Sequence, residues 1–197
     1  KEIVESITKC TLVMSNNPNS KNSSNEFDDS KRISVCFVQC LFRILKKFKL
    51  SEEINVELRR TNRYHKEFCV IILDADNFKE VNDQLGHNAG DKVLKQIADV
   101  ILKSIRKTDI AARWGGEEFL IICSGIGVSS AASAAEKLRK IIDLHDFSPA
   151  QGITASFGVT EWKTSDTKES LVLKADKALY QAKREGRNRV CVELNNC

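Results

Sequence analysis

Few prolines and glycines interrupt this sequence, which has 2 Pro and 9 Gly among 197 residues, so a collagen-like chain is excluded. Long apolar runs are also missing. The best candidate, residues 33–45, is interrupted by Gln39 and Arg43, and we therefore expect no transmembrane helix. The N-terminus has glutamate where a secretory signal would be basic, so we expect no signal peptide. Apolar residues make up 42% of the chain and charged residues 29%, which excludes wholesale disorder.

Neither sign of charge dominates the chain. Lysine and arginine number 31, aspartate and glutamate 27, and the formal net charge is +4. This balance is too weak to indicate nucleic-acid binding, and no DNA-docking motif accompanies it. A mildly basic surface suits small anionic molecules equally well.

Paired-cysteine motifs are absent as well. None of the seven cysteines belongs to a Cys-x-x-Cys sequence, and Cys69, Cys123 and Cys191 each lie within an apolar run. A thiol in such a run behaves as a small core hydrophobe. This usage favours a reducing compartment, and we expect a cytoplasmic protein.

Four segments can be distinguished along the chain. Residues 1–14 predict a short amphipathic segment, and residues 15–31 are dominated by Ser and Asn, which predicts a loop or an insertion. Residues 32–66 predict a helical segment that joins or completes the domain, because apolar residues from Ile33 to Phe48 form one stripe. That stripe suits packing on the same domain, or on a second chain. Residues 67–197 hold the remaining elements.

The pattern from residue 68 onward predicts the order β-α-α-β-β-α-β-α-β. The continuous apolar run 68–73 predicts a strand buried on both faces. Gly115 and Gly116 predict the turn of a hairpin, and the stretch 86–90 predicts a break between two helices. This order is typical of a split β-α-β arrangement in the α+β class, with an antiparallel sheet and helices on one face. The other predicted elements are helices at 78–85, 91–107, 129–144 and 170–184 and strands at 110–114, 117–123, 153–162 and 189–194.

Acidic residues follow the first strand and the hairpin turn. Asp74 and Asp76 are two residues apart, so in a strand both carboxylates could converge on one face. Glu117 and Glu118 open the second arm of the hairpin, and one of them would lie near Asp74 if the hairpin pairs with the first strand. Carboxylate and carbonyl oxygens are the ligands that Mg²⁺ prefers, with phosphate oxygens completing its shell. Taken singly, each acid would be interpreted as a solvated loop end.

Basic residues occur where a triphosphate would need them. Lys79 begins a helix, whose N-terminal amides favour anions. A second group surrounds Gly186 and consists of Lys183, Arg184, Arg187 and Arg189. Without the acids, this group would be interpreted as a solvated helix C-terminus.

Four motifs in this order resemble the GGDEF-domain diguanylate cyclases. They are DADNFKEVND at 74–83, GHNAGD at 86–91, RWGGEEF at 113–119 and ADKALYQAKREGRN at 175–188. The signature is the GGEEF variant, and the resemblance covers about residues 68–194. It implies a GGDEF catalytic domain over residues 67–197. The implied fold is palm-like and related to nucleotidyl cyclases and polymerases, with a central, mostly antiparallel sheet flanked by helices.

The resemblance also implies roles for individual residues. Asp74, Glu117 and the carbonyl of Ala75 would ligate Mg²⁺, with Mn²⁺ as an alternative ion. The implied catalytic residues are Glu117, as general base, and Lys79. Guanine would be recognised by Asn82 and Asp91, whose amide and carboxylate match the guanine edge. The phosphates would be held by the backbone of Phe78 and Lys79 and by the side chains of Lys183 and Arg187.

The implied reaction condenses two GTP molecules into cyclic di-GMP and releases two pyrophosphates. Each chain would bind one GTP, so a homodimer would be needed for catalysis. Arg106 and Asp109 match the family's Arg-x-x-Asp inhibitory site, six residues before Gly115, which predicts feedback inhibition by cyclic di-GMP. A helix-end ion pair is the other interpretation of these two residues.

The sequence departs from the family's pattern at one motif, and three alternative interpretations apply to it. The family's usual opening, Asp-x-Leu-Thr-Gly-Leu-x-Asn-Arg, has no good match here, which leaves the role of residues 1–62 open. A non-catalytic module that binds GTP or cyclic di-GMP is the main alternative, although such modules usually have degenerate signatures. A cyclase making a mixed dinucleotide is disfavoured by Asp91, a guanine-reading residue. A zinc site formed by Cys36, Cys40 and His65 or His87 lacks the required spacing.

Overall fold

The computed structural model describes residues 50, 52–61, 63–64 and 66–193. The predicted segments 1–14 and 15–31, and the apolar stripe from Ile33 to Phe48, lie outside these residues. Residues 52–61 are helical, in agreement with the prediction for this part of the chain. No helix in the described part of the chain is long and apolar enough to cross a membrane.

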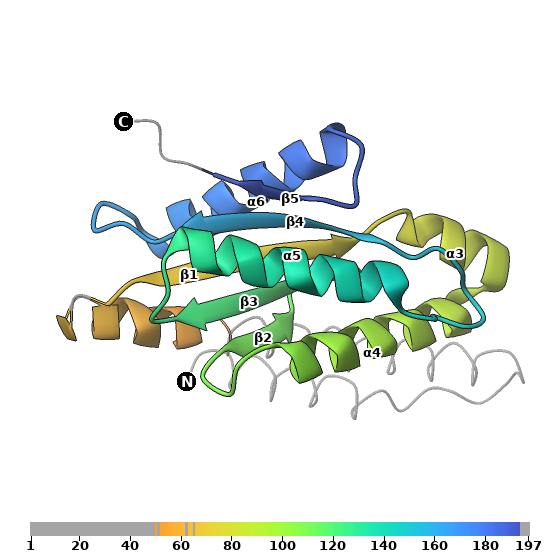
Figure 1. Ribbon diagram of the computed structural model, residues 1–197, viewed down its shortest axis with the longest axis horizontal. Coiled ribbons are helices and arrows are strands. Elements are labelled where there is room, and N and C mark those ends of the chain that lie inside the picture. Colours follow the sequence, from red (N-terminus) through yellow and green to blue (C-terminus); the bar gives the residue numbers. More distant parts are fainter. Residues whose placement is uncertain (1–49, 51, 62, 65, 194–197) are drawn as a thin grey trace, which may run out of the picture. The chain divides into compact units, whose positions relative to one another are not determined.

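Five strands of the described residues form one sheet in the order β2-β3-β1-β4-β5 (Figure 1). The central strand β1 (Phe68–Ala75) pairs antiparallel with β3 (Glu118–Ser124) and with β4 (Ala155–Glu161). The edge strand β2 (Ile110–Arg113) is antiparallel to β3, and only β5 (Val190–Val192) is parallel to its neighbour, β4. The predicted element order and the mostly antiparallel sheet are thus confirmed.

Helices cover both faces of the sheet, so the prediction of helices on one face is wrong. Every residue of β1 is buried. Cys69, Ile71 and Leu73 share a core with α4 (His87–Ser104) and α5 (Val128–Leu144). Phe68, Val70 and Ile72 instead share a core with α6 (Lys168–Arg184) and with Leu50 and Ile54 from the N-terminal side. A strand that is apolar on both faces needs a layer on each side to remove it from water.

The break between the first two helices is shorter than the sequence suggested. Helix α3 (Phe78–Leu85) ends at Gly86, whose φ of 79° is left-handed, and α4 begins at the next residue. Gly90, which was expected to belong to the break, lies inside α4. There it meets the side chains of Asn82 and Phe78 on α3. The second glycine therefore permits close helix packing and does not interrupt the helix.

Candidate active site

The β1–β3 pairing brings the acidic residues together. Asp74 lies opposite Glu118 in the antiparallel register, and the amide of Ala75 donates to the carbonyl of Glu117 at 3.4 Å. The loop before β3 is closed by its own hydrogen bonds, from Arg113 Nε to the Gly116 carbonyl at 2.7 Å and from the Trp114 amide to the Glu118 carbonyl at 2.8 Å. The hairpin does lie beside the first strand, and under this condition the sequence predicted that one of its glutamates would come near Asp74, as Glu118 does.

The carboxylates at this end of the sheet create an excess of negative charge. Burial raises the pKa of Asp74, as do the nearby carboxylates of Glu117 and Asp76, while Lys183 opposes the rise. Burial likewise raises the pKa of Glu118, and Asp74 and Asp176 add to the effect. Lys183 Nζ lies 2.9 Å from Asp74 Oδ1 and supplies the nearest positive charge. A site of this kind favours a bound cation, because a cation relieves the repulsion between like charges.

The donor set at this position suits magnesium chemically. In the described part of the chain, no group of three or more His, Cys, Asp or Glu side chains is arranged to hold a metal ion. The set predicted from the sequence consists instead of two carboxylates, those of Asp74 and Glu117, and the backbone carbonyl of Ala75. All three donors are hard oxygens, and their excess negative charge matches a divalent cation.

Asp76 has different partners from Asp74, although the two residues are only two positions apart. Its Oδ2 accepts hydrogen bonds from Thr154 Oγ1 at 2.7 Å and from the amide of Asn188 at 3.0 Å. Its Oδ1 accepts from Ser156 Oγ at 2.7 Å. Strand β1 ends at Ala75, so the alternation of side chains along a strand does not fix the direction of Asp76.

The two residues expected to recognise guanine lie on adjacent helices. Asn82 is on α3 and Asp91 is in the first turns of α4. A methyl group placed on Gly90 would overlap Asn82 Oδ1, and it would lie 3.0 Å from Cζ of Phe78. The amide of Asn82 therefore lies directly over the backbone that precedes Asp91. Asn82 is half-buried and Asp91 is exposed.

The basic residues expected to hold phosphate come from two helices and a turn. Lys79 is exposed in the first turn of α3, next to Phe78, whose ring is buried. Lys183 lies in the last turn of α6. Arg187 is exposed in the turn between α6 and β5, with a left-handed φ of 61°.

Arg106 and Asp109 lie in the connection between α4 and β2. The amide of Arg106 donates to Asp109 Oδ2 at 3.0 Å, and the amide of Asp109 donates to the Arg106 carbonyl at the same distance. Both residues line a cavity of about 590 Å³ that also includes Ser133 and Lys137 from α5. The two residues thus form one turn that lines a cavity.

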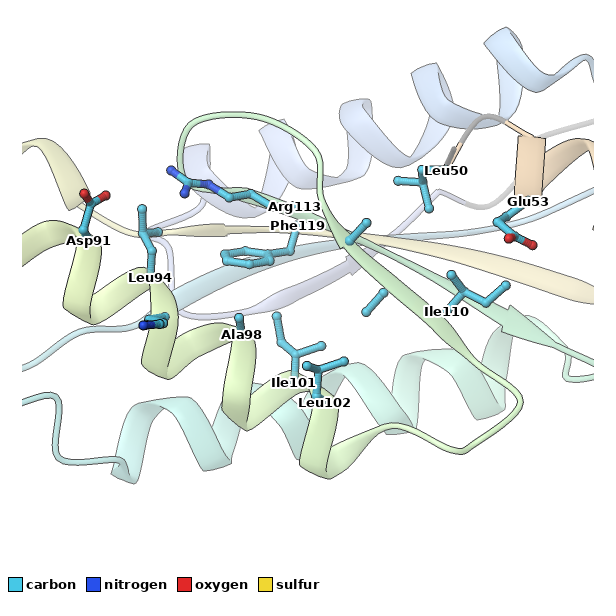
Figure 2. Close-up of a pocket in the computed structure, with 13 residues that line it drawn as sticks. Leu50, Glu53, Asp91, Leu94, Ala98, Ile101, Leu102, Ile110, Arg113 and Phe119 are labelled. Carbon is cyan, nitrogen blue, oxygen red and sulfur yellow. The ribbon is translucent and has the colours of Figure 1, made fainter. Parts of the chain in front are cut away.

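Another cavity is lined by none of the carboxylates of Asp74, Glu117 and Glu118. It has a volume of about 720 Å³ and lies between α4, β2, Leu50 and Glu53 (Figure 2). Asp91 is the one predicted site residue that lines it, and Figure 2 shows Asp91 at one end, beside Leu94. The remaining lining is mostly apolar.

A smaller cavity of about 420 Å³ lies against the carboxylates and includes residues that the sequence analysis missed. Glu118 and Lys183 line it together with Asp176 and Tyr180 of α6. Asp176, Tyr180 and Lys183 follow one another at spacings of four and three, which is one face of a helix. This helical spacing is visible in the sequence and could have predicted that Asp176 and Tyr180 lie on the same face of the helix as Lys183.

A family model described as "Diguanylate cyclase, GGDEF domain" matches residues 41–189. Diguanylate cyclase A of Treponema denticola is 39% identical over 154 residues, which cover 76% of this chain and 41% of that protein. Diguanylate cyclase DgcP of Pseudomonas aeruginosa is 39% identical over 144 residues, which cover 72% of this chain and 22% of that protein. The chain thus spans less than half the length of these curated relatives.

Solved structures of similar proteins share the fold. The active GGEEF domain of a diguanylate cyclase from Vibrio cholerae has a TM-score of 0.72 and 33% identity, covering 77% of this chain and 98% of that one. The GGDEF domain of DgcB from Caulobacter crescentus, in complex with c-di-GMP, has a TM-score of 0.70 and 33% identity, covering 75% of this chain and 90% of that one. The palm-like fold expected from the sequence is confirmed by these neighbours.

Proposed function

The chain belongs to the GGDEF-domain family of diguanylate cyclases, and from this premise we propose that it condenses two GTP molecules into cyclic di-GMP in a Mg²⁺-dependent reaction. The observation that supports this most is the group of carboxylates at the paired ends of β1 and β3, with Lys183 against Asp74. The thiols of Cys69, Cys123 and Cys191 are free and buried, which suits the reducing cytoplasm where we propose that the protein works.

We assign substrate recognition to two groups of residues. Asn82 and Asp91 bind the guanine edge, because a carboxylate accepts from the ring N–H and the exocyclic amine while an amide donates to the carbonyl. The amides of Phe78 and Lys79 and the side chains of Lys183 and Arg187 bind the β- and γ-phosphates. An amide cluster at a helix start and two cations are the donors that phosphate oxygens accept best.

The chemistry is an in-line displacement at phosphorus. The 3′-hydroxyl oxygen of one GTP forms a bond to the α-phosphorus of the other, and the bond from that phosphorus to the bridging oxygen of pyrophosphate breaks. Glu117 is our candidate for accepting the hydroxyl proton, and Lys79 stabilises the negative charge of the departing pyrophosphate. Asp74, Glu117 and the Ala75 carbonyl would hold Mg²⁺, which when bound supplies polarisation of the phosphoryl group and a lower pKa for the hydroxyl. A second bond of the same kind closes the ring.

We further propose that Arg106 and Asp109 bind the product. Their turn lines a cavity, and an arginine can bind both phosphate and guanine. Cyclic di-GMP added at the start of the reaction should slow the wild type, and Arg106→Ala should be slowed less at the same product concentration.

The test is to incubate the purified chain with GTP and Mg²⁺ and to separate the nucleotides. We expect cyclic di-GMP from the wild type, and a rate at least about 100-fold lower for Glu117→Ala, because that change removes a proposed metal ligand. Asp99→Ala is the matched control, since it removes an exposed carboxylate on α4, and it should keep the wild-type rate. GTP or cyclic di-GMP binding without any product would instead favour the non-catalytic module.

A further inference from the structure

Asp76 is a buried carboxylate that the proposed reaction does not use. Its residue is 5% exposed, and its two oxygens accept three hydrogen bonds of 3.0 Å or less. Two of the donors are hydroxyl groups: Ser156 lies in β4, and Thr154 is the residue just before this strand. The third is the backbone amide of Asn188 in the turn between α6 and β5. One side chain therefore connects the end of β1 to this turn.

The turn has a conformation that needs external support. Arg187 and Asn188 both have positive φ angles, 61° and 45°, and neither is a glycine. A non-glycine residue in the left-handed region costs about 1 kcal/mol or more, so two in succession persist only when surrounding contacts hold them. Besides the bond to Asp76, the Asn188 side chain accepts from Arg139 Nη1 at 2.7 Å. The amide of Arg187 donates to the carbonyl of Ala182 at 3.0 Å.

These contacts have a consequence for phosphate binding. Arg187 is next to Asn188 in this turn and belongs to the residues that we assign to the β- and γ-phosphates. The bond from the Asn188 amide to Asp76 fixes the peptide that joins these two residues, and it thereby fixes where the Arg187 side chain starts. Without the carboxylate, the two residues lose a contact that offsets their backbone strain, and the guanidinium must be ordered at the expense of binding energy.

We propose that Asp76 is a positioning residue for triphosphate recognition, which holds the turn at 186–188 so that Arg187 meets the β- and γ-phosphates. This inference rests on the proposed function, because it takes GTP as the substrate. It concerns hydrogen bonds and not charge: an asparagine at 76 whose amide oxygen takes the place of Oδ2 can still accept from the Asn188 amide and the Thr154 hydroxyl, and its NH2 group can donate to the Ser156 hydroxyl.

The test separates positioning from a general loss of stability. Dissociation constants are measured for 3′-deoxy-GTP, which cannot turn over, and for GMP, which lacks the β- and γ-phosphates. Asp76→Ala should weaken 3′-deoxy-GTP binding about 10- to 100-fold, the value of hydrogen bonds to a charged group, and leave GMP binding within about twofold. Asp76→Asn should recover most of the loss. If Asp76→Ala does not fold, Asp76→Ser takes its place, because its hydroxyl is too short to reach the Asn188 amide.

Two further variants complete the design. Arg187→Ala should weaken the binding of 3′-deoxy-GTP as much as Asp76→Ala does. The double variant should bind 3′-deoxy-GTP within about twofold of the affinity of Arg187→Ala alone. Asp166→Ala is the matched control. It also removes a largely buried carboxylate with three partners, Lys163, Ser170 and Lys174, but it lies before α6 and should not alter the preference for the triphosphate.

The outcomes discriminate between the two proposals. Three results would each overturn the positioning role without touching the proposed cyclase activity. The first is that Asp76→Ala weakens the binding of 3′-deoxy-GTP and of GMP equally, and the second is that its effect on 3′-deoxy-GTP binding adds fully to that of Arg187→Ala. The third is that Asp166→Ala weakens 3′-deoxy-GTP binding as much as Asp76→Ala does. A folded wild type that neither binds GTP nor forms cyclic di-GMP would overturn the proposed function itself, and the positioning role with it.

Discussion

Two aspartates that are nearly adjacent in the chain have different environments. Asp74 belongs to a cluster of carboxylates and, within the described part of the chain, forms an ion pair with Lys183. Among the described residues, the hydrogen-bond donors to Asp76 are neutral groups, two hydroxyls and one amide. An incompletely compensated charge suits metal binding, whereas a fully hydrogen-bonded carboxylate suits a structural task. We therefore assign the metal to the first residue and the geometry of the turn to the second.

Gly90 provides a test of guanine recognition at the scale of one residue. A methyl group at this position would overlap the amide oxygen of Asn82, so Gly90→Ala should displace that side chain. We expect guanosine binding to weaken at least about tenfold, because a hydrogen bond to the base is lost and a donor is left unpaired. The measurement is a guanosine titration. Gly116→Ala, whose methyl group meets no atom within 4 Å, is the control for stability, and unchanged guanosine binding by a folded Gly90→Ala would contradict the assignment of Asn82.

Two buried thiols predict how stability depends on pH. Cys69 and Cys123 lie opposite each other on β1 and β3, and burial is the main cause that raises the pKa of each to about 12. In the unfolded chain the ordinary value is 9.0, so between pH 9 and 12 the unfolded state loses protons that the folded state keeps. Their contribution to stability is therefore complete below pH 9 and is lost as the pH rises toward 12.

The measurement is the free energy of unfolding in urea at several pH values. Each thiol should add up to about 1.4 kcal/mol per pH unit to the decline above pH 9. A Cys69→Ala, Cys123→Ala double variant starts less stable, but its stability should fall less steeply over the same range. Parallel curves for the wild type and the double variant would show that the thiols do not cause the decline.

Local pattern accounts for only part of this site. The proximity of Asp74 to Glu118 could be predicted, because a hairpin that pairs with β1 fixes it by register. The partners of Asp76 could not, since Thr154, Ser156 and Asn188 are 78, 80 and 112 positions away. Contacts over such separations depend on how β4 and α6 pack against β1, and periodicity within one element contains no information about that packing.

At the scale of elements, α6 is positioned by one glycine of β4. A methyl group on Gly158 would overlap the backbone carbonyl oxygen of Ala175 and the backbone nitrogen of Leu179. Backbone atoms cannot move aside as a flexible side chain can, so Gly158→Ala should separate α6 from the sheet. We expect a loss of about 3 kcal/mol in the free energy of unfolding.

The same substitution should also affect the site, because α6 carries Lys183 onto Asp74. Urea unfolding measures the first effect, and cyclase assays at a temperature where the variant is folded measure the second. Ala155→Gly, a change at another buried position of β4 that adds no atoms, is the comparison. Wild-type stability of Gly158→Ala would mean that α6 has room above the strand.

Some boundaries of the helices and strands follow from the local sequence, and others depend on contacts with distant residues. The apolar run of β1 and the periodic helices α5 and α6 were predictable, since their patterns follow the strand and helix repeats. The start of α4 was not, because Gly86 and Gly90 look alike in the sequence. Only the first has a left-handed φ, while the second is inside a helix where Asn82 leaves no room for a side chain. The apolar run of β1 predicted a strand buried on both faces, whereas the order of the elements predicted helices on one face, and the structure agrees with the first of these predictions.

At the scale of the whole molecule, the stoichiometry of the proposed reaction makes a kinetic prediction. Cyclic di-GMP contains two guanylate units, and we assign one GTP site to each chain, so product formation requires two chains. When most chains are monomeric, tenfold dilution should lower the rate per chain about tenfold, and the rate should become independent of concentration once dimers dominate. Pyrophosphate release over a dilution series, compared with sedimentation at the same concentrations, measures this.

A mixing experiment makes the prediction independent of absolute rates. Glu117→Ala should still bind GTP through its guanine and phosphate contacts, so a tenfold excess of this variant draws wild-type chains into mixed dimers in which one half cannot react. Product formation per wild-type chain should then fall, whereas the same excess of Asp99→Ala should raise it by supplying competent partners. A rate per chain that stays constant on dilution into the monomeric range, together with no inhibition by Glu117→Ala, would mean that a single chain completes both bonds.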